Sequence, residues 1–139
     1  MMDDFRSQLN EIVDAMLEQN IEPVVLVVDL WGSEYIKRHR GAESADQFRE
    51  AAGNCITNIC GGGAFVYGEQ RIVGVMPAPN RIKTFAFIQK LQRSLPLVAQ
   101  SYDCILQPEF DVLEFEPSGG VAGIMAQLVK LPMIRAEAA

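Results

Sequence analysis

The chain has 139 residues, with 12 Lys and Arg against 18 Asp and Glu, which gives a formal net charge of −6. Hydrophobic residues make up 49% of the sequence, too many for a disordered chain. A chain of this length forms one domain without a metal or disulfide staple. The acidic balance argues against a protein that neutralises nucleic-acid phosphates or anionic lipid, so we expect no nucleic-acid and no membrane partner.

The cysteines Cys55, Cys60 and Cys104 do not indicate a disulfide framework, because their number is odd and no basic-then-apolar leader precedes them. Their spacing does not match a zinc site either, so we expect buried core thiols. No apolar run approaches the roughly 18 to 20 residues that span a bilayer. We therefore expect a cytoplasmic protein.

The first half of the chain predicts a helix, a strand and a broken helix. Residues 22–30 form a β-branched and aliphatic run that predicts a strand buried on both faces. A helical stretch then begins near Ser33, breaks at Arg40 and Gly41, and resumes at Ser44 until the glycines at 61–63. Residues 3–20 predict an amphipathic N-terminal helix, because apolar residues recur at spacings of three and four: Phe5, Leu9, Ile12, Val13, Met16 and Leu17.

The second half begins with a hairpin. Residues 64–67 and 71–76 predict two short strands joined by the tight turn at 68–70. A helix from Arg81 is expected to end at Leu95, before Pro96. Extended segments follow at residues 102–106 and 110–115, and a final helix covers residues 118–130.

These elements predict a single α+β domain over residues 1–139, with an N-terminal helix over residues 1–20 and an α+β core over residues 22–131. The core order β-α-β-β-α-β predicts a ferredoxin-like sandwich with helices on one face of an antiparallel-rich sheet. The apolar stripe of the N-terminal helix packs either on its own domain or on a second copy, and the second option makes a homodimer.

Two carboxylates are expected to meet at one end of this sheet. Asp29 ends the predicted central strand, and Glu69 lies at the tip of the hairpin that pairs beside it. Such a pair suits a Mg²⁺ ion shared with substrate phosphates. The structural alternative is an Asp that caps the following helix and a solvated Glu in a turn.

The motifs around both carboxylates resemble the nucleotidyl cyclase superfamily, which includes class III cyclases and the GGDEF domains of diguanylate cyclases. VVDLWGS at residues 27–33 is similar to the strand and turn that carry the first metal-binding Asp. The stretch at residues 62–79, GGAFVYGEQRIVGVMPAP, is similar to the second metal hairpin. The resemblance implies a cyclase-like fold, a role in bacterial signalling, and Mg²⁺ or Mn²⁺ held by Asp29, Glu69 and the Leu30 carbonyl.

The same resemblance implies a nucleotide ligand. It places Gly32 and Ser33 near the triphosphate, and Lys37, Arg38 and Arg71 are then expected to face phosphate. The basic run KRHR at residues 37–40 has a simpler reading as a solvated helix face.

The sequence departs from the diguanylate signature Gly-Gly-Asp/Glu-Glu-Phe. One Gly is lost, and Gln70 and Arg71 replace Glu and Phe. No Arg-x-x-Asp precedes the hairpin, and no segment matches the one that carries the transition-state Asn and Arg of class III cyclases. We therefore interpret the chain as a degenerate cyclase-like regulatory or binding domain, non-catalytic or weakly catalytic, and expect a homodimer.

Two alternatives stay open at this stage. One is an active metal-dependent cyclase whose missing groups come from a second subunit, and the other is a dimeric protein-interaction domain of the roadblock or longin type. A protein partner is also compatible with the acidic ribbon near the C-terminus, which otherwise only protects an edge strand from aggregation. The ribbon consists of Glu109, Asp111, Glu114 and Glu116.

Overall fold

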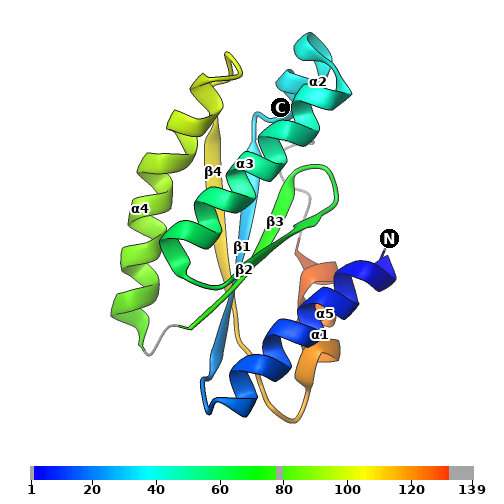
Figure 1. The fold of residues 1–139 in the computed structure, drawn as a ribbon, viewed down its shortest axis with the longest axis vertical. Coiled ribbons are helices and arrows are strands. Elements are labelled where there is room, and N and C mark those ends of the chain that lie inside the picture. Colours follow the sequence, from blue (N-terminus) through cyan, green and yellow to red (C-terminus); the bar gives the residue numbers. More distant parts are fainter. Residues whose placement is uncertain (1, 78–79, 132–139) are drawn as a thin grey trace.

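A computed structural model describes residues 2–77 and 80–131 of the chain (Figure 1). Five helices and four strands alternate in a single α+β arrangement within these residues. The N-terminal half contains α1 (Met2–Glu18), β1 (Pro23–Trp31), α2 (Glu34–Arg40) and α3 (Ala42–Cys60). The remainder contains β2 (Gly63–Tyr67), β3 (Arg71–Pro77), α4 (Arg81–Gln100), β4 (Gln107–Leu113) and α5 (Gly120–Lys130).

The four strands form one antiparallel sheet in the order β2-β3-β1-β4. Strand β1 is central, because it pairs with β3 from Pro23 to Asp29 and with β4 from Val25 to Trp31. The hairpin strand β3 therefore lies between β1 and β2, as a split βαβ unit requires. This topology confirms the predicted α+β, β-α-β-β-α-β sandwich.

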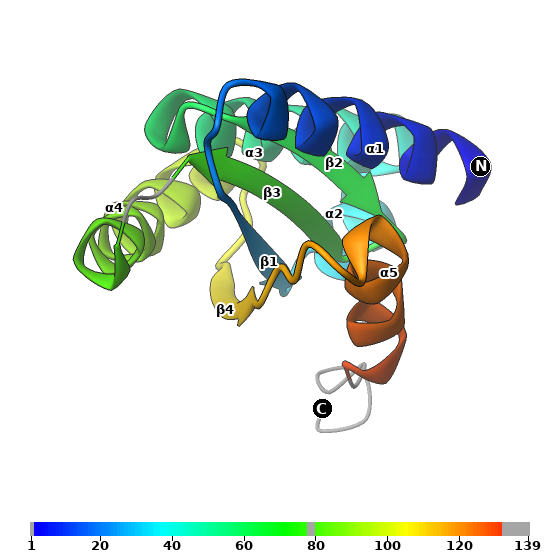
Figure 2. The same ribbon diagram turned by 90° about the horizontal axis from the view of Figure 1, so that it is seen from below.

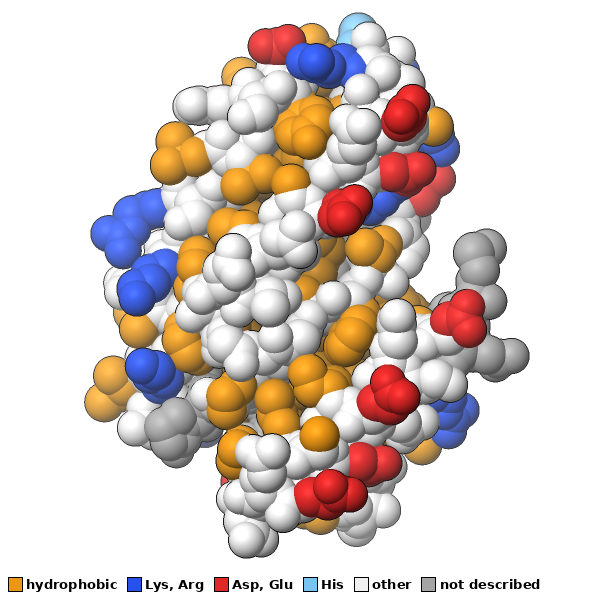
Figure 3. Space-filling view, in the orientation of Figure 1, with side chains coloured by type: hydrophobic (Ala, Val, Ile, Leu, Met, Phe, Trp, Pro, Cys, Tyr) orange, Lys and Arg blue, Asp and Glu red, His pale blue; other side chains and the backbone are white. Residues whose placement is uncertain are grey.

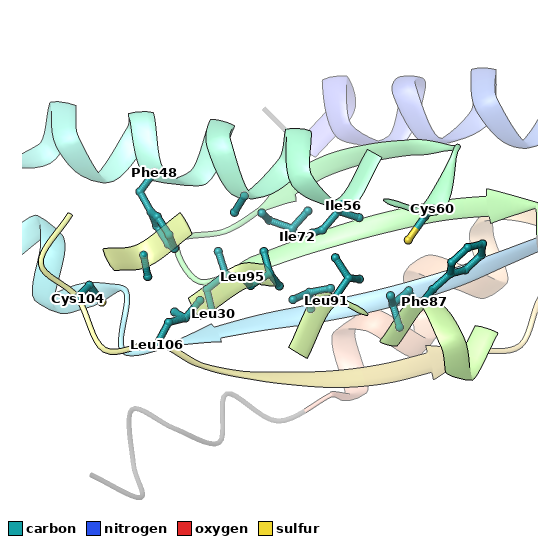
Figure 4. Close-up of a cluster of buried hydrophobic side chains, with 14 of the residues drawn as sticks. Leu30, Phe48, Ile56, Cys60, Ile72, Phe87, Leu91, Leu95, Cys104 and Leu106 are labelled. Carbon is teal, nitrogen blue, oxygen red and sulfur yellow. The ribbon is translucent and has the colours of Figure 1, made fainter. Parts of the chain in front are cut away.

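Helices α3 and α4 cover one face of the sheet (Figure 4). Successive side chains of a strand point to opposite faces, so alternate residues of β1 enter this core. They are Leu26, Val28 and Leu30, all fully buried. Each helix packs one buried stripe of side chains against these residues. The stripes include Phe48, Ala52 and Ile56 from α3 and Phe87, Leu91, Leu95 and Ala99 from α4.

The core helices α3 and α4 thus lie on one face of the sheet, as the sequence predicts, and α1 and α5 cover the opposite face (Figure 2). The stripe of α1 is buried against Val25 and Val27 of β1 and against Val73 and Val75 of β3. That stripe therefore packs on its own domain, and it no longer argues for a dimer. Helix α5 completes this second core with Val121, Ile124 and Leu128.

Helix α4 runs through Pro96 to Gln100, although the sequence predicts an end at Leu95. Proline removes one backbone hydrogen bond, but Leu91, Leu95 and Ala99 lie four residues apart and are all fully buried. Packing of this stripe holds the helix together past the proline. The chain then turns at Asp103, which has φ 54°, so residues 102–106 form a connection and not the expected strand.

The first two of the three glycines after α3 have separate structural roles. Gly61 ends the helix in the left-handed conformation, with φ 75°, and its N–H donates to the Thr57 carbonyl. Gly62 lies against β3, where a Cβ atom would stand 1.8 Å from the Val75 carbonyl oxygen. Both observations confirm the expected helix stop and loop. Within the described ranges, no helix is long and apolar enough to cross a membrane.

Candidate functional site

Asp29 and Arg71 form a largely buried ion pair at one end of the sheet. The two residues are direct partners in the β1–β3 pairing, and Arg71 Nε donates to Asp29 Oδ1 at 2.7 Å. The side chains are only 4% exposed for Arg71 and 14% for Asp29. Arg71 Nη1 also donates to the Leu131 carbonyl at 3.3 Å, just after α5. Arg71 thus joins Asp29 to the layer of α1 and α5.

Glu69 lies at the exposed tip of the β2–β3 hairpin and is held by the opposite helical layer. Its Oε1 atom accepts from Lys37 Nζ of α2 at 3.1 Å, and its carbonyl accepts from Arg49 Nη1 of α3 at 3.3 Å. The neighbouring Gln70 Nε2 donates to Glu34 Oε2 at 3.4 Å. Side chains of α2 and α3 therefore hold the hairpin tip.

The turn after β1 is closed by the connection between α4 and β4. Gly32 has φ 105°, and a Cβ atom there would lie 2.7 Å from the Ile105 carbonyl oxygen. Ser33 is 5% exposed, and its N–H donates to the Leu30 carbonyl at 3.0 Å. Cys104 Sγ donates to the Gly32 carbonyl at 3.4 Å. The turn is therefore packed against the protein's own backbone.

The proposed metal ligands already have other partners in this arrangement. Asp29 accepts from a buried guanidinium, Glu69 pairs with Lys37, and the Leu30 carbonyl accepts from a backbone N–H. Across residues 2–77 and 80–131, no group of three or more His, Cys, Asp or Glu could hold a metal ion. As arranged, this donor set does not fit Mg²⁺ or Mn²⁺. Metal ligation by Asp29, Glu69 and the Leu30 carbonyl is not observed and stays a prediction from the sequence.

The residues expected to face phosphate are divided among three places. Lys37 and Arg38 are exposed on α2, and Lys37 contacts the hairpin tip through Glu69, whereas Gly32 and Ser33 form the closed turn. Arg71 lies on the other side of the sheet, against Asp29 and the residue that follows α5. Of the five residues, the structure therefore places only Lys37 in contact with the hairpin tip.

A cavity of about 360 Å³ beside the hairpin is lined by polar residues that the sequence does not predict as part of a site. It lies between α3 and the hairpin strands and is lined by Asp46, Arg49, Asn54 and Thr57, with Val66 of β2 among the apolar residues. Arg49 also pairs with Asp46. The only signal in the sequence is the spacing of three between these charges on a predicted helix, and that spacing does not show that the hairpin folds onto them.

The three thiols belong to the packed interior. Cys60 and Cys104 are buried and Cys55 is half-buried, all without a disulfide. Burial raises the pKa of Cys60 to about 11, with a smaller effect of the neighbouring Cys55. Burial also raises the pKa of Cys55 and of Cys104. A raised pKa disfavours the thiolate, so these groups are poor nucleophiles near neutral pH.

No protein-family model matches the sequence, and no curated protein matches it. Solved structures that share the fold include two GGDEF proteins. One is the GGDEF domain of DgcB from Caulobacter crescentus in complex with c-di-GMP, with a TM-score of 0.65, 12% identity, and coverage of 88% of this chain and 77% of that chain. The other is a sensory box/GGDEF family protein from Caulobacter crescentus CB15, with a TM-score of 0.64, 14% identity, and coverage of 99% and 92%. The chain therefore has a GGDEF-like, cyclase-like fold.

Proposed function

We propose that this domain is a non-catalytic regulatory module that binds the phosphates of a nucleotide without a metal ion. The ion pair of Arg71 with Asp29 carries the proposal, because a divalent cation at Asp29 must compete with a guanidinium that is 4% exposed. Removing the partner of a buried charge costs several kcal/mol, so the pair opposes metal binding. Fold similarity adds that the GGDEF domain of DgcB was solved with c-di-GMP, a phosphate-bearing ligand.

The phosphate-binding groups that we propose are Lys37 and Arg38 of α2 and Arg49 of α3. Lys37 and Glu69 are 54% and 74% exposed, and exposed ion pairs contribute only about 0–1 kcal/mol. A phosphate group can therefore replace Glu69 as the partner of Lys37 at little cost. The cavity beside Arg49 offers the amide of Asn54 and the hydroxyl of Thr57 to the rest of the ligand.

The same arrangement supports the proposed absence of catalysis. Cyclisation of a nucleoside triphosphate releases pyrophosphate, and such phosphoryl chemistry depends on metal ions that neutralise the developing charge. In the alternative of an active cyclase, Asp29 would have to hold a metal ion beside the buried Arg71 guanidinium, whose positive charge repels a cation.

A thermal-shift titration with c-di-GMP, GTP and ATP, each with Mg²⁺, Mn²⁺ or EDTA, tests the proposal. Ligand at 100 times its Kd adds about 2.7 kcal/mol to the free energy of unfolding, which raises the Tm by several degrees. We expect a rise that persists in EDTA and is lost in Lys37→Ala. Lys90→Ala, which changes an exposed lysine of α4, is the matched control.

Pyrophosphate release is measured in parallel. We expect none from the wild type with GTP or ATP and either metal. Metal-dependent release that is lost in Glu69→Gln would establish the active cyclase instead. If no nucleotide raises the Tm, the binding proposal is wrong.

A homodimer also remains a proposal, with light scattering as its test. Because α1 is packed within its own domain, a dimer would have to use another surface. The roadblock or longin alternative is less favoured, since both structural neighbours are GGDEF proteins.

A further inference from the structure

A second cavity, of about 730 Å³, lies between the start of α4, the start of β1 and the end of β4. We call it the α4–β4 groove. Its lining includes Phe85, Ile88 and Val112, and two of these remain open to solvent, Phe85 at 60% and Val112 at 48% exposure. Ile82, one turn before Phe85, is 81% exposed. Figure 3 looks onto the side of α3 and α4, where hydrophobic side chains lie among polar ones. Apolar surface of this extent in a groove marks an interaction site.

The charges of this groove are unbalanced. Glu22, Glu114 and Glu116 line it and are exposed, and none of the three forms an ion pair with a described residue. Arg81 is the one basic residue in the lining. The groove thus combines an apolar floor with an acidic rim, which complements a basic and apolar ligand.

We propose that the α4–β4 groove docks a short basic segment of a partner protein. An apolar side chain of that segment covers Phe85 and Val112, and its Lys or Arg side chains lie beside Glu114 and Glu116. Burial of the apolar contact supplies affinity, and the charges select the partner and speed association. The proposal does not depend on nucleotide binding, because the groove shares no lining residue with the cavity beside Arg49.

A second copy of this chain is the less suitable occupant. Its exposed basic run, KRHR at residues 37–40, contains no large apolar side chain that could cover Phe85 and Val112. A partner segment that carries both cations and apolar side chains fits the groove better.

Fluorescence anisotropy with three labelled peptides and the full chain tests the proposal. The probe is Lys-Leu-Arg-Phe-Lys-Leu-Arg. One control peptide replaces every Lys and Arg by Glu, and the other replaces Leu and Phe by Ser. We expect the probe to bind with a Kd that rises with NaCl concentration, because screening weakens contacts between exposed charges. Neither control peptide should bind.

Variants assign the binding to the groove. We expect Phe85→Ser and the double change Glu114→Lys with Glu116→Lys each to raise the Kd of the probe about tenfold or more. The matched controls are Leu97→Ser at the other end of α4, where Leu97 is 61% exposed, and a double change on α1, Glu11→Lys with Glu18→Lys. These controls should leave the Kd unchanged.

Any of the following results would overturn the proposal. One is a Kd above about 1 mM for the probe. Equal binding of a control peptide is a second. Another is an equal loss of affinity in the matched controls. The last is sedimentation showing that wild-type chains self-associate and that Phe85→Ser abolishes this association, which would make a second copy the occupant.

Discussion

Arg71 and Asp29 face each other across two central strands, with Arg71 Nε 2.7 Å from Asp29 Oδ1. The pair sits where the sequence predicts a metal-binding carboxylate, and it gives that carboxylate a cation from its own chain. The guanidinium also reaches the Leu131 carbonyl, so one side chain joins β1, β3 and the end of α5. This position explains why the arginine is tolerated in a buried place.

Asp29→Ala should lower the free energy of unfolding by about 3 kcal/mol, because it removes the carboxylate that accepts from the buried Arg71 Nε. Urea unfolding followed by circular dichroism measures the loss. Asp29→Ala combined with Arg71→Met should recover part of it, since the second change replaces the buried guanidinium with an apolar side chain. A single variant as stable as the wild type would show that the pair contributes nothing to the fold.

Lys37→Ala should change the free energy of unfolding by less than about 1 kcal/mol, because both partners of its ion pair with Glu69 are exposed. The same urea experiment measures it, and the loss should disappear in high salt. A loss as large as that of Asp29→Ala would mean that the hairpin tip is a rigid part of the core and not an adaptable ligand-binding element.

The sequence alone predicted the sheet, the hairpin and the cores more readily than the site. A continuous β-branched run predicts β1 and a period of 3.6 predicts α3, because both patterns reflect burial, and burial stabilises these elements. The sequence predicts Asp29 at the end of β1, which continues to Trp31, and Glu69 in the hairpin turn, where it lies. It shows neither which cation faces each carboxylate nor that α2 and α3 hold the hairpin tip. Those contacts are tertiary contacts between residues far apart in the sequence.

Two differences in the fold have the same origin. The sequence predicts the end of α4 at Pro96 from a local rule, whereas the burial of Ala99 beyond it is a tertiary effect. In the same way, the stripe of α1 shows that the helix is amphipathic but not which surface it covers. The face of the sheet that α1 covers depends on the order of the strands, which the stripe does not specify.

Gly62→Ala should destabilise the domain by about 2 to 3 kcal/mol, because the added Cβ atom would overlap the Val75 carbonyl and push α3 and β3 apart. Gly53→Ala is the matched change. Gly53 lies inside α3 with no atom near the position of a Cβ, so alanine there should stabilise by roughly 0.5 to 1 kcal/mol. Thermal unfolding of both variants checks the pair, and a neutral Gly62→Ala would contradict the close approach.

Alkaline pH should weaken the fold through Cys60. The thiol of the unfolded chain loses its proton near pH 9.0, whereas burial raises the pKa in the folded state to about 11. Between these values unfolding releases a proton, so stability that is present below pH 9 falls as the pH rises, by at most about 1.4 kcal/mol per unit. Urea unfolding at pH 8, 9 and 10 should show a shallower fall for Cys60→Ala. Equal slopes would contradict the raised pKa.

The packing of α1 has a consequence for shortened chains. Without this helix, the face of the sheet that carries Val25, Val27, Val73 and Val75 would lose most of its cover and become a flat, sticky surface beside exposed strand edges. A protein that begins at Glu22 should therefore express poorly and collect in the insoluble fraction. Helix α1 thus prevents aggregation of the domain by covering this face of the sheet.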